Sequence, residues 1–292
     1  MTATVLSGKA ALVVAHPGHE LCVYGWLEQA RPLVFVLTDG SGRSGVSRLD
    51  STTKILARVG ARPGSVYGRF ADLELYAAIL RGDFALFERL TAELAAAFVS
   101  EGIDYVAGDA AEGYNPVHDA CRMVIDAAAE LASRESGRRV VSRDFTLFRR
   151  HNRLHEGAGA GAVRLKLDDA QLGRKLSLAR EYPELQDEVT ALLDRKSLDA
   201  LRAFPELSAH IDDFVTGDMG NEAYREECLR LAAGPACGDA EEAAAGAAGE
   251  VPFYERYGEM LVASGAYDSA IRRREHVEPL ADALRRFAGA DA

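Results

Sequence analysis

The stretch Ala10-Ala11-Leu12-Val13-Val14-Ala15-His16-Pro17-Gly18-His19-Glu20 decides the fold of this 292-residue chain. Its first six residues form an unbroken apolar run, which is typical of a strand buried on both faces of a sheet. The run stops at Pro17 and Gly18, because proline keeps the preceding residue extended and lacks an amide donor, while glycine permits almost any backbone angle. The sequence therefore predicts a buried strand that ends in a sharp turn carrying two imidazoles.

Strands and helices alternate through the first half of the chain. Further strands are predicted at 33–37, 65–67, 103–107 and 140–148. Helices are predicted at 21–30, 51–59, 84–99 and 118–133, the second of them capped by Ser51 and ended by Gly60. This order predicts an α/β fold with a doubly wound, mostly parallel sheet of the Rossmann-like kind.

The second half changes character, because helical patterns replace the alternation. They cover 170–182, 184–193, 224–233 and 253–287, whereas 236–250 is nearly all Ala, Gly and Glu and offers few large side chains to bury. We therefore expect an α/β domain with the functional site over 1–165. A mainly helical portion over 166–292 should pack on it, with a flexible stretch at 236–250.

Composition limits the classes of partner. The net charge of −11 argues against nucleic acid and anionic membranes, which require a concentrated basic face. The four cysteines form no C-x-x-C pair, and no apolar run approaches the ~20 residues that span a bilayer. The expectation is a cytoplasmic protein with reduced thiols that acts on a small molecule; a homo-oligomer stays open.

Three histidines are predicted to meet at one edge of the sheet. His16 and His19 follow the first strand and His118 follows the fourth, and the carboxyl ends of parallel strands share an edge. Neutral imidazoles bind zinc and its neighbours, and an open catalytic zinc site has three protein ligands. The spacing thus indicates a metal site. The alternative is that His16 caps the turn, His19 faces solvent and His118 only starts a helix.

Two motifs resemble those of the LmbE-like, or PIG-L, family of metal-dependent N-deacetylases. The family's opening motif, Ala-His-Pro-Asp-Asp-Glu, stands here as Ala15 to Glu20, and its second motif, His-Pro-Asp-His, stands as Asn115-Pro116-Val117-His118. Between them, Leu37 to Gly40 and Ala57 to Ala61 continue the resemblance, which covers about residues 8 to 135. It implies an LmbE-like fold and a hydrolase that removes the acyl group of an N-acyl amine, such as an acetamido sugar. The implied cofactor is a divalent metal that activates water, Zn²⁺ first and Fe²⁺ or Mn²⁺ next.

The chain departs from the family pattern at three positions. The first Asp of the opening motif, the general base in the family, is Gly18, and the second, a metal ligand, is His19. The first His of the second motif, which stabilises the tetrahedral intermediate in the family, is Asn115. Loss of a general base costs typically ~10²–10⁴-fold in rate unless another group replaces it. An Asn can still donate a hydrogen bond to an oxyanion.

Carboxylates near the same edge are candidates to replace the base. Glu112 comes first, because it lies in the loop before His118 and its side chain is long; Glu20 comes second, with a turn-capping role as its alternative. Three further carboxylates near this edge are Asp39, Asp109 and Asp119. The residues predicted to bind substrate are Arg43, Arg48, Asp39 and Tyr114.

Two other function classes stay open. Three imidazoles also suit a non-hydrolytic metalloenzyme that uses Fe(II), Mn(II) or Cu. A binding protein that keeps the fold without catalysis is the other, because a fold does not determine a function.

Overall fold

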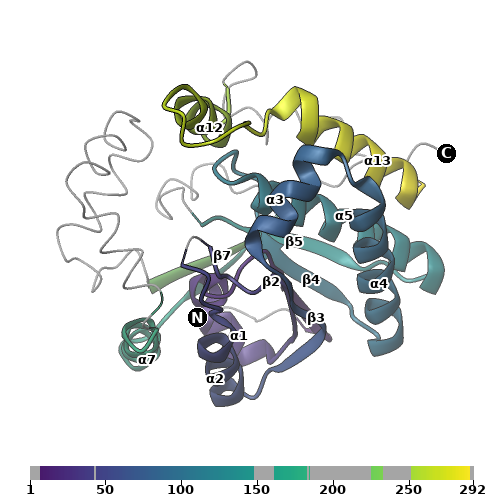
Figure 1. The fold of residues 1–292 in the computed structure, drawn as a ribbon. Helices are drawn as coiled ribbons and strands as arrows, with labels where there is room; N and C mark the ends of the chain where they lie inside the picture. Colours follow the sequence, from purple (N-terminus) through teal and green to yellow (C-terminus); the bar gives the residue numbers. More distant parts are fainter. Residues whose placement is uncertain are drawn as a thin grey trace.

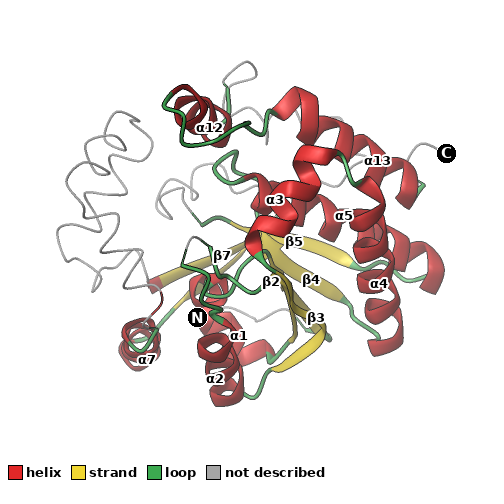
Figure 2. Cartoon of the chain, in the orientation of Figure 1, coloured by secondary structure: helices red, strands yellow, loops and turns green. Residues whose placement is uncertain are grey.

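The computed structural model describes residues 7–42, 44–147, 161–182, 184, 225–232 and 251–289. Within them, one sheet runs in the order β3-β2-β1-β4-β5-β7-β6 (Figure 2). Its strands are β1 (Ala10–Val14), β2 (Leu33–Thr38), β3 (Arg62–Phe70), β4 (Tyr105–Asp109), β5 (Val141–Phe145), β6 (Val163–Lys166) and β7 (Glu226–Leu231). The five neighbouring strands β3, β2, β1, β4 and β5 pair in parallel, and β7 is antiparallel to both β5 and β6. The predicted α/β fold with a mostly parallel sheet is confirmed.

Helices cover both faces of the sheet (Figure 1). On one face lie α3 (Asp72–Arg81), α4 (Phe84–Glu101), α5 (Pro116–Ser136) and α13 (Glu278–Ala288). On the other lie α1 (Tyr24–Ala30), α2 (Leu49–Val59) and α7 (Asp169–Arg180). A 3₁₀ helix, η1 (His19–Val23), precedes α1, while α12 (Phe253–Ala263) and a π-helical turn, η4 (Arg273–Val277), precede α13. The architecture is doubly wound.

The strand β1 lies at the centre of both apolar cores. Ala11 and Val13 belong to the core under α4 and α5, and Leu12 and Val14 belong to the core under α1 and α2. All four side chains are fully buried, as the continuous apolar run predicts.

The edge of the sheet near β3 differs from the prediction. β3 extends to Phe70 instead of ending at residue 67, and α3 follows it where no helix was predicted. Most of β3 is half-exposed, so its sequence lacks the apolar run of the inner strands. Ser51 does not cap α2, which begins at Leu49; its hydroxyl donates to Glu184 instead.

The second half of the chain adds strands to the sheet. The segment predicted as a helix at 224–233 contains β7, and β6 was not predicted at all. The sequence of β7, Glu-Glu-Cys-Leu-Arg-Leu, is rich in helix formers, but pairing with β5 and β6 overrides that preference. The predicted helix at 253–287 is interrupted between α12 and η4. The sheet crosses the predicted domain boundary at residue 165, which stays a prediction; the stretch 236–250 and residues 185–193 lie outside the described residues.

A buried ion pair ties this second half to α1. Both carboxylate oxygens of Glu227, on β7, accept backbone amides at the start of α1, from Gly25 at 2.8 Å and from Trp26 at 2.9 Å. Lys175, on α7, donates to the same carboxylate at 2.9 Å. Glu227 is 2% exposed and Lys175 is 5% exposed. Glu227 therefore acts as a tertiary N-terminal cap for α1.

No helix in the described segments is long and apolar enough to cross a membrane. The described cysteines, Cys22, Cys121 and Cys228, are free thiols.

Candidate metal centre

The candidate site lies at the topological switch point of the sheet. Strands β2 and β3 extend the sheet on one side of β1, and β4 and β5 extend it on the other. The crevice at the carboxyl ends of β1 and β4 is the position where open α/β sheets bind ligands. His16 and His19 follow β1, and Asp109 is the last residue of β4.

Glu20 stabilises the turn after β1 by hydrogen bonds. This side chain is fully buried, and its carboxylate accepts the amide of Gly18 at 2.7 Å and the hydroxyl of Thr52 at 2.8 Å. Burial raises the pKa of Glu20 to about 7. Gly18 itself has φ 107°, a left-handed conformation that side-chain-bearing residues rarely adopt. The turn is therefore built around a glycine at the position where the family resemblance implies a base.

Three imidazole rings converge at this edge. The ring centres of His16 and His19 are 5.4 Å apart, those of His16 and His118 are 4.9 Å apart, and those of His19 and His118 are 4.6 Å apart. Every pair is arranged edge to face, with interplanar angles of 83°, 61° and 83°. The structure thus brings together the three residues that the sequence proposed as ligands.

A buried carboxylate fixes the orientation of His16. Its Nδ1 lies 2.9 Å from Oδ1 of Asp72, at the start of α3, and 2.8 Å from Oγ1 of Thr38. Burial alone would raise the pKa of Asp72, but hydrogen bonding and electrostatic attraction to His16 outweigh it, and the pKa falls to about 2. An ionised carboxylate only accepts, so Nδ1 of His16 carries a proton, and in the neutral ring Nε2 then holds the lone pair that a metal requires. In the described part of the chain, this buried Nε2 has no hydrogen-bond partner.

His19 has a matching carboxylate in Asp109. Its Nδ1 lies 3.0 and 2.9 Å from the two oxygens of Asp109, a residue with no exposed surface. Oδ2 of Asp109 also accepts the amide of Ala15 at 2.8 Å, which anchors it to the end of β1. In the neutral ring, an Nδ1–H that donates to Asp109 leaves Nε2 of His19 with the lone pair.

His118 and Asn115 occupy the start of α5. His118 is 5% exposed, and burial, together with the neighbouring His19 and His16, lowers its pKa well below the usual value. Asn115 is the N-cap residue: its Oδ1 accepts the amide of Val117 at 2.8 Å, and its Nδ2 donates to the hydroxyl of Tyr76 at 2.7 Å. Both ends of the Asn115 amide are thus held in place.

These residues fit a divalent ion of the zinc type. An imidazole nitrogen binds such an ion at about 2 Å, so two ring centres around a shared tetrahedral ion lie about 5 Å apart. The three observed separations bracket that value, and the buried Nε2 of His16 is the kind of atom that a metal satisfies. Among the described residues, no group of three or more His, Cys, Asp or Glu side chains is placed so that it could hold a metal ion as it stands. The donor type and the ring spacing therefore suit a zinc-type ion, while the side chains as placed do not close on one point.

The candidate bases have structural partners. Oε2 of Glu112 accepts the amide of Leu147 at 2.7 Å, and Oδ1 of Asp119 accepts the amides of Glu112 and Gly113. Burial raises the pKa of Asp119 to about 7. Asp119 and Glu112 therefore shape the loop between β4 and α5, and a catalytic role for Glu112 stays a prediction.

The residues predicted to bind substrate lie in two loops. Oδ1 of Asp39 accepts the amide of Ser41 at 2.9 Å, and the carbonyl of Asp39 accepts the amide of Arg48. The ring of Tyr114 stacks on that of Phe253, with ring centres 5.0 Å apart and an interplanar angle of 4°. Arg43 lies outside the described residues.

Sequence reasoning missed two contributors and assigned another a different role. Asp72 and Tyr76 lie on α3, a helix that the sequence did not predict, so neither is among the predicted site residues. Asp109 was considered as a base, but its carboxylate contacts the ring of His19. An acidic residue just after a strand end was the available signal for Asp72.

No family model and no curated protein sequence matches this chain. Two solved structures resemble it at low identity. One is a deacetylase triple mutant (Orf2*T) involved in the teicoplanin biosynthetic pathway, with 16% identity and a TM-score of 0.46. The other is the zinc-inhibited form of teicoplanin deacetylase Orf2, with 14% identity and a TM-score of 0.47. Each alignment covers 76% of this chain and 97% of the other. Likenesses this weak carry no argument about the chemistry of the site.

Proposed function

We propose that this chain is a metal-dependent hydrolase that removes the acyl group from a small N-acyl amine, with His16, His19 and His118 holding the ion. The observation that carries the proposal is the convergence of three imidazoles. In two of them, His16 and His19, Nδ1 lies within hydrogen-bonding distance of a buried carboxylate. The resemblance of the two sequence motifs to those of N-deacetylases supports the acyl-amine substrate class. A divalent ion bound there would supply Lewis acidity and lower the pKa of a water molecule to near neutrality.

Asp72 and Asp109 act as positioning residues in this proposal. Each accepts a hydrogen bond from Nδ1–H of one histidine, which fixes the tautomer and the orientation of the ring. They also place a carboxylate against the Nδ1 side of each of these two imidazoles. The site therefore has carboxylates in an outer layer where the resemblance implies one among the ligands.

Asn115 is the candidate donor to the developing oxyanion. One N–H of its amide donates to Tyr76, and its oxygen accepts the amide of Val117, so the direction of the second N–H is set by the fold. A preorganised donor stabilises charge in a transition state without reorganisation.

Glu112 is the candidate base. Position 18 cannot accept a proton, and the left-handed backbone there disfavours a side chain. The backbone amide of Glu112 is held by Asp119, and its carboxylate by the amide of Leu147, which keep it at the carboxyl edge of the sheet. In this role its carboxylate would take the proton from the attacking water.

A second candidate function is a non-hydrolytic metalloenzyme. The observation that favours it is the all-imidazole character of the converging set, combined with Gly18 in place of a base. Imidazole sites suit iron and copper as well as zinc.

Metal analysis followed by an activity panel tests the proposal. Purified wild-type protein should hold about one equivalent of divalent metal, and His16→Ala should lose it. His276→Ala is the matched control, because this half-buried histidine of η4 accepts a hydrogen bond from the backbone amide of Arg272. Metal-loaded wild type should then release acid from at least one of a panel of N-acetyl sugars and N-acyl amines. Equal metal content in wild type and His16→Ala would contradict the metal site, and a redox-active metal without acyl release would favour the second candidate.

A further inference from the structure

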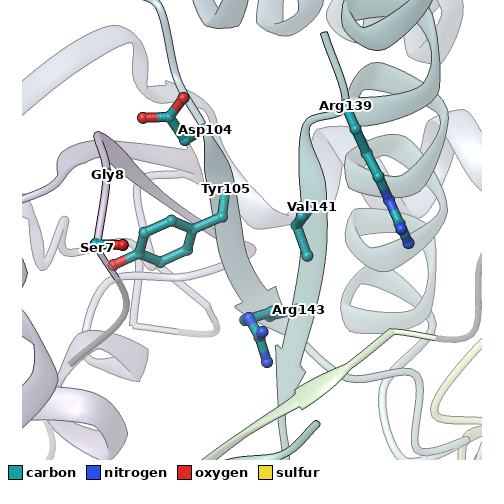
Figure 3. A pocket seen from close by; sticks show the side chains of 7 residues that line it. All are labelled: Ser7, Gly8, Asp104, Tyr105, Arg139, Val141 and Arg143. Carbon is teal, nitrogen blue, oxygen red and sulfur yellow. The ribbon is translucent and has the colours of Figure 1, made fainter. Parts of the chain in front are cut away.

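A hollow lies at the opposite edge of the sheet from the three histidines. This hollow of about 480 Å³ opens where β1, β4 and β5 begin, and it is lined by Tyr105, Arg139 and Arg143 among others (Figure 3). The three histidines follow the carboxyl ends of β1 and β4, so the length of these strands separates the hollow from them.

Arg143 is a buried cation that lacks a carboxylate partner. It is 8% exposed, and its Nη1 donates to the carbonyl of Gly161 at 2.9 Å. Its Nε is buried without a hydrogen-bond partner, and no salt bridge joins Arg143 to an acid within the described segments. Burial lowers the pKa of this guanidinium, which nevertheless stays charged. Charges that are largely buried in proteins are normally paired, so an anion in the hollow would supply the partner that Arg143 lacks among the described residues.

The surroundings of Arg143 keep the hollow positive. Arg139 is exposed and forms no salt bridge among the residues described. The acid in the hollow, Asp104, is already engaged: Oδ1 pairs with Arg138 at 3.0 Å, and Oδ2 accepts the amide of Lys9 at 2.8 Å. Two arginines therefore line the hollow, and neither forms an ion pair with an acid among the described residues, in a chain whose net charge is −11.

We infer that this hollow binds a small molecule through a phosphate or carboxylate group, with Arg143 and Arg139 as its ligands. Guanidinium groups bind both oxyanions through paired, charge-assisted hydrogen bonds. The volume is in the range of small-molecule sites. The site is separate from the proposed hydrolytic centre, and the inference does not depend on that proposal.

Calorimetric titration with inorganic phosphate, and separately with citrate, tests the inference at constant ionic strength. Wild type should bind at least one of them, and the arm that binds identifies the group. Arg143→Gln and Arg139→Ala should each weaken binding about tenfold or more, the scale of one charge-assisted hydrogen bond. Arg58→Ala is the matched control, because this exposed arginine on α2 pairs with Glu181 and does not line the hollow, and it should bind within about twofold of wild type.

Three results would overturn the inference: no binding of either anion to wild type, equal binding by wild type and both arginine variants, or loss of phosphate binding in His16→Ala. Loss of phosphate binding in His16→Ala would mean that the anion binds at the three histidines and not in the hollow. Since Arg139 is exposed, its variant keeps the test decisive even if Arg143→Gln fails to fold.

Discussion

Replacing Asp109 by Asn isolates the outer carboxylate of the candidate metal centre. Oδ2 of Asp109 accepts from the amide of Ala15 at 2.8 Å and from Nδ1 of His19 at 2.9 Å, and Oδ1 lies 3.0 Å from the same nitrogen. Asparagine has the same shape and can present one oxygen to both donors, but it lacks the negative charge that polarises the His19 ring. Loss of such an outer partner typically lowers metal affinity by ~10–100-fold. This corresponds to about 1.4–2.7 kcal/mol of binding free energy.

The assay is competition for Zn²⁺ between the protein and a chromophoric chelator of known affinity. Asp126→Asn is the matched control, because this partly buried carboxylate on α5 hydrogen-bonds to Arg122 and Ser142 and to none of the three histidines. Circular dichroism should show both variants folded. Zinc affinity that is unchanged in Asp109→Asn, or equally reduced in Asp126→Asn, would refute the idea that Asp109 supports the metal through His19.

Three further predictions concern catalysis and stability. Glu112→Gln should lower kcat by ~10²–10⁴-fold with metal content retained, and a normal kcat would remove Glu112 as the base. Gly18→Asp should lower the free energy of unfolding by about 1–3 kcal/mol, because φ is 107° there; it should raise activity only if no other group serves as base, so urea unfolding and turnover are measured together. Glu227→Ala should destabilise the fold by about 3–5 kcal/mol, because it leaves Lys175 buried and unpaired and uncaps α1; a urea midpoint equal to that of wild type would show that the pair contributes nothing.

The local sequence was sufficient to predict the central strands and the position of the histidines. The apolar run of β1 has one low-energy use, burial on both faces, and Pro17 with Gly18 ends it at one place. The order of strands and helices then predicts a shared carboxyl edge, so His16, His19 and His118 could be expected to meet. Each of these steps depends on residues close together in the chain.

Tertiary contacts decided the rest. Strand β7 has a helix-forming sequence and becomes a strand only because β5 and β6 offer backbone partners. The partners of the imidazoles, Asp72 and Asp109, come from positions 56 and 90 residues away along the chain. Hydrogen bonds at such separations leave no periodic pattern in a sequence, because they depend on how packed elements approach one another. The positions of the histidines could therefore be predicted from the sequence, whereas their tautomers and their outer carboxylates were decided by the tertiary structure.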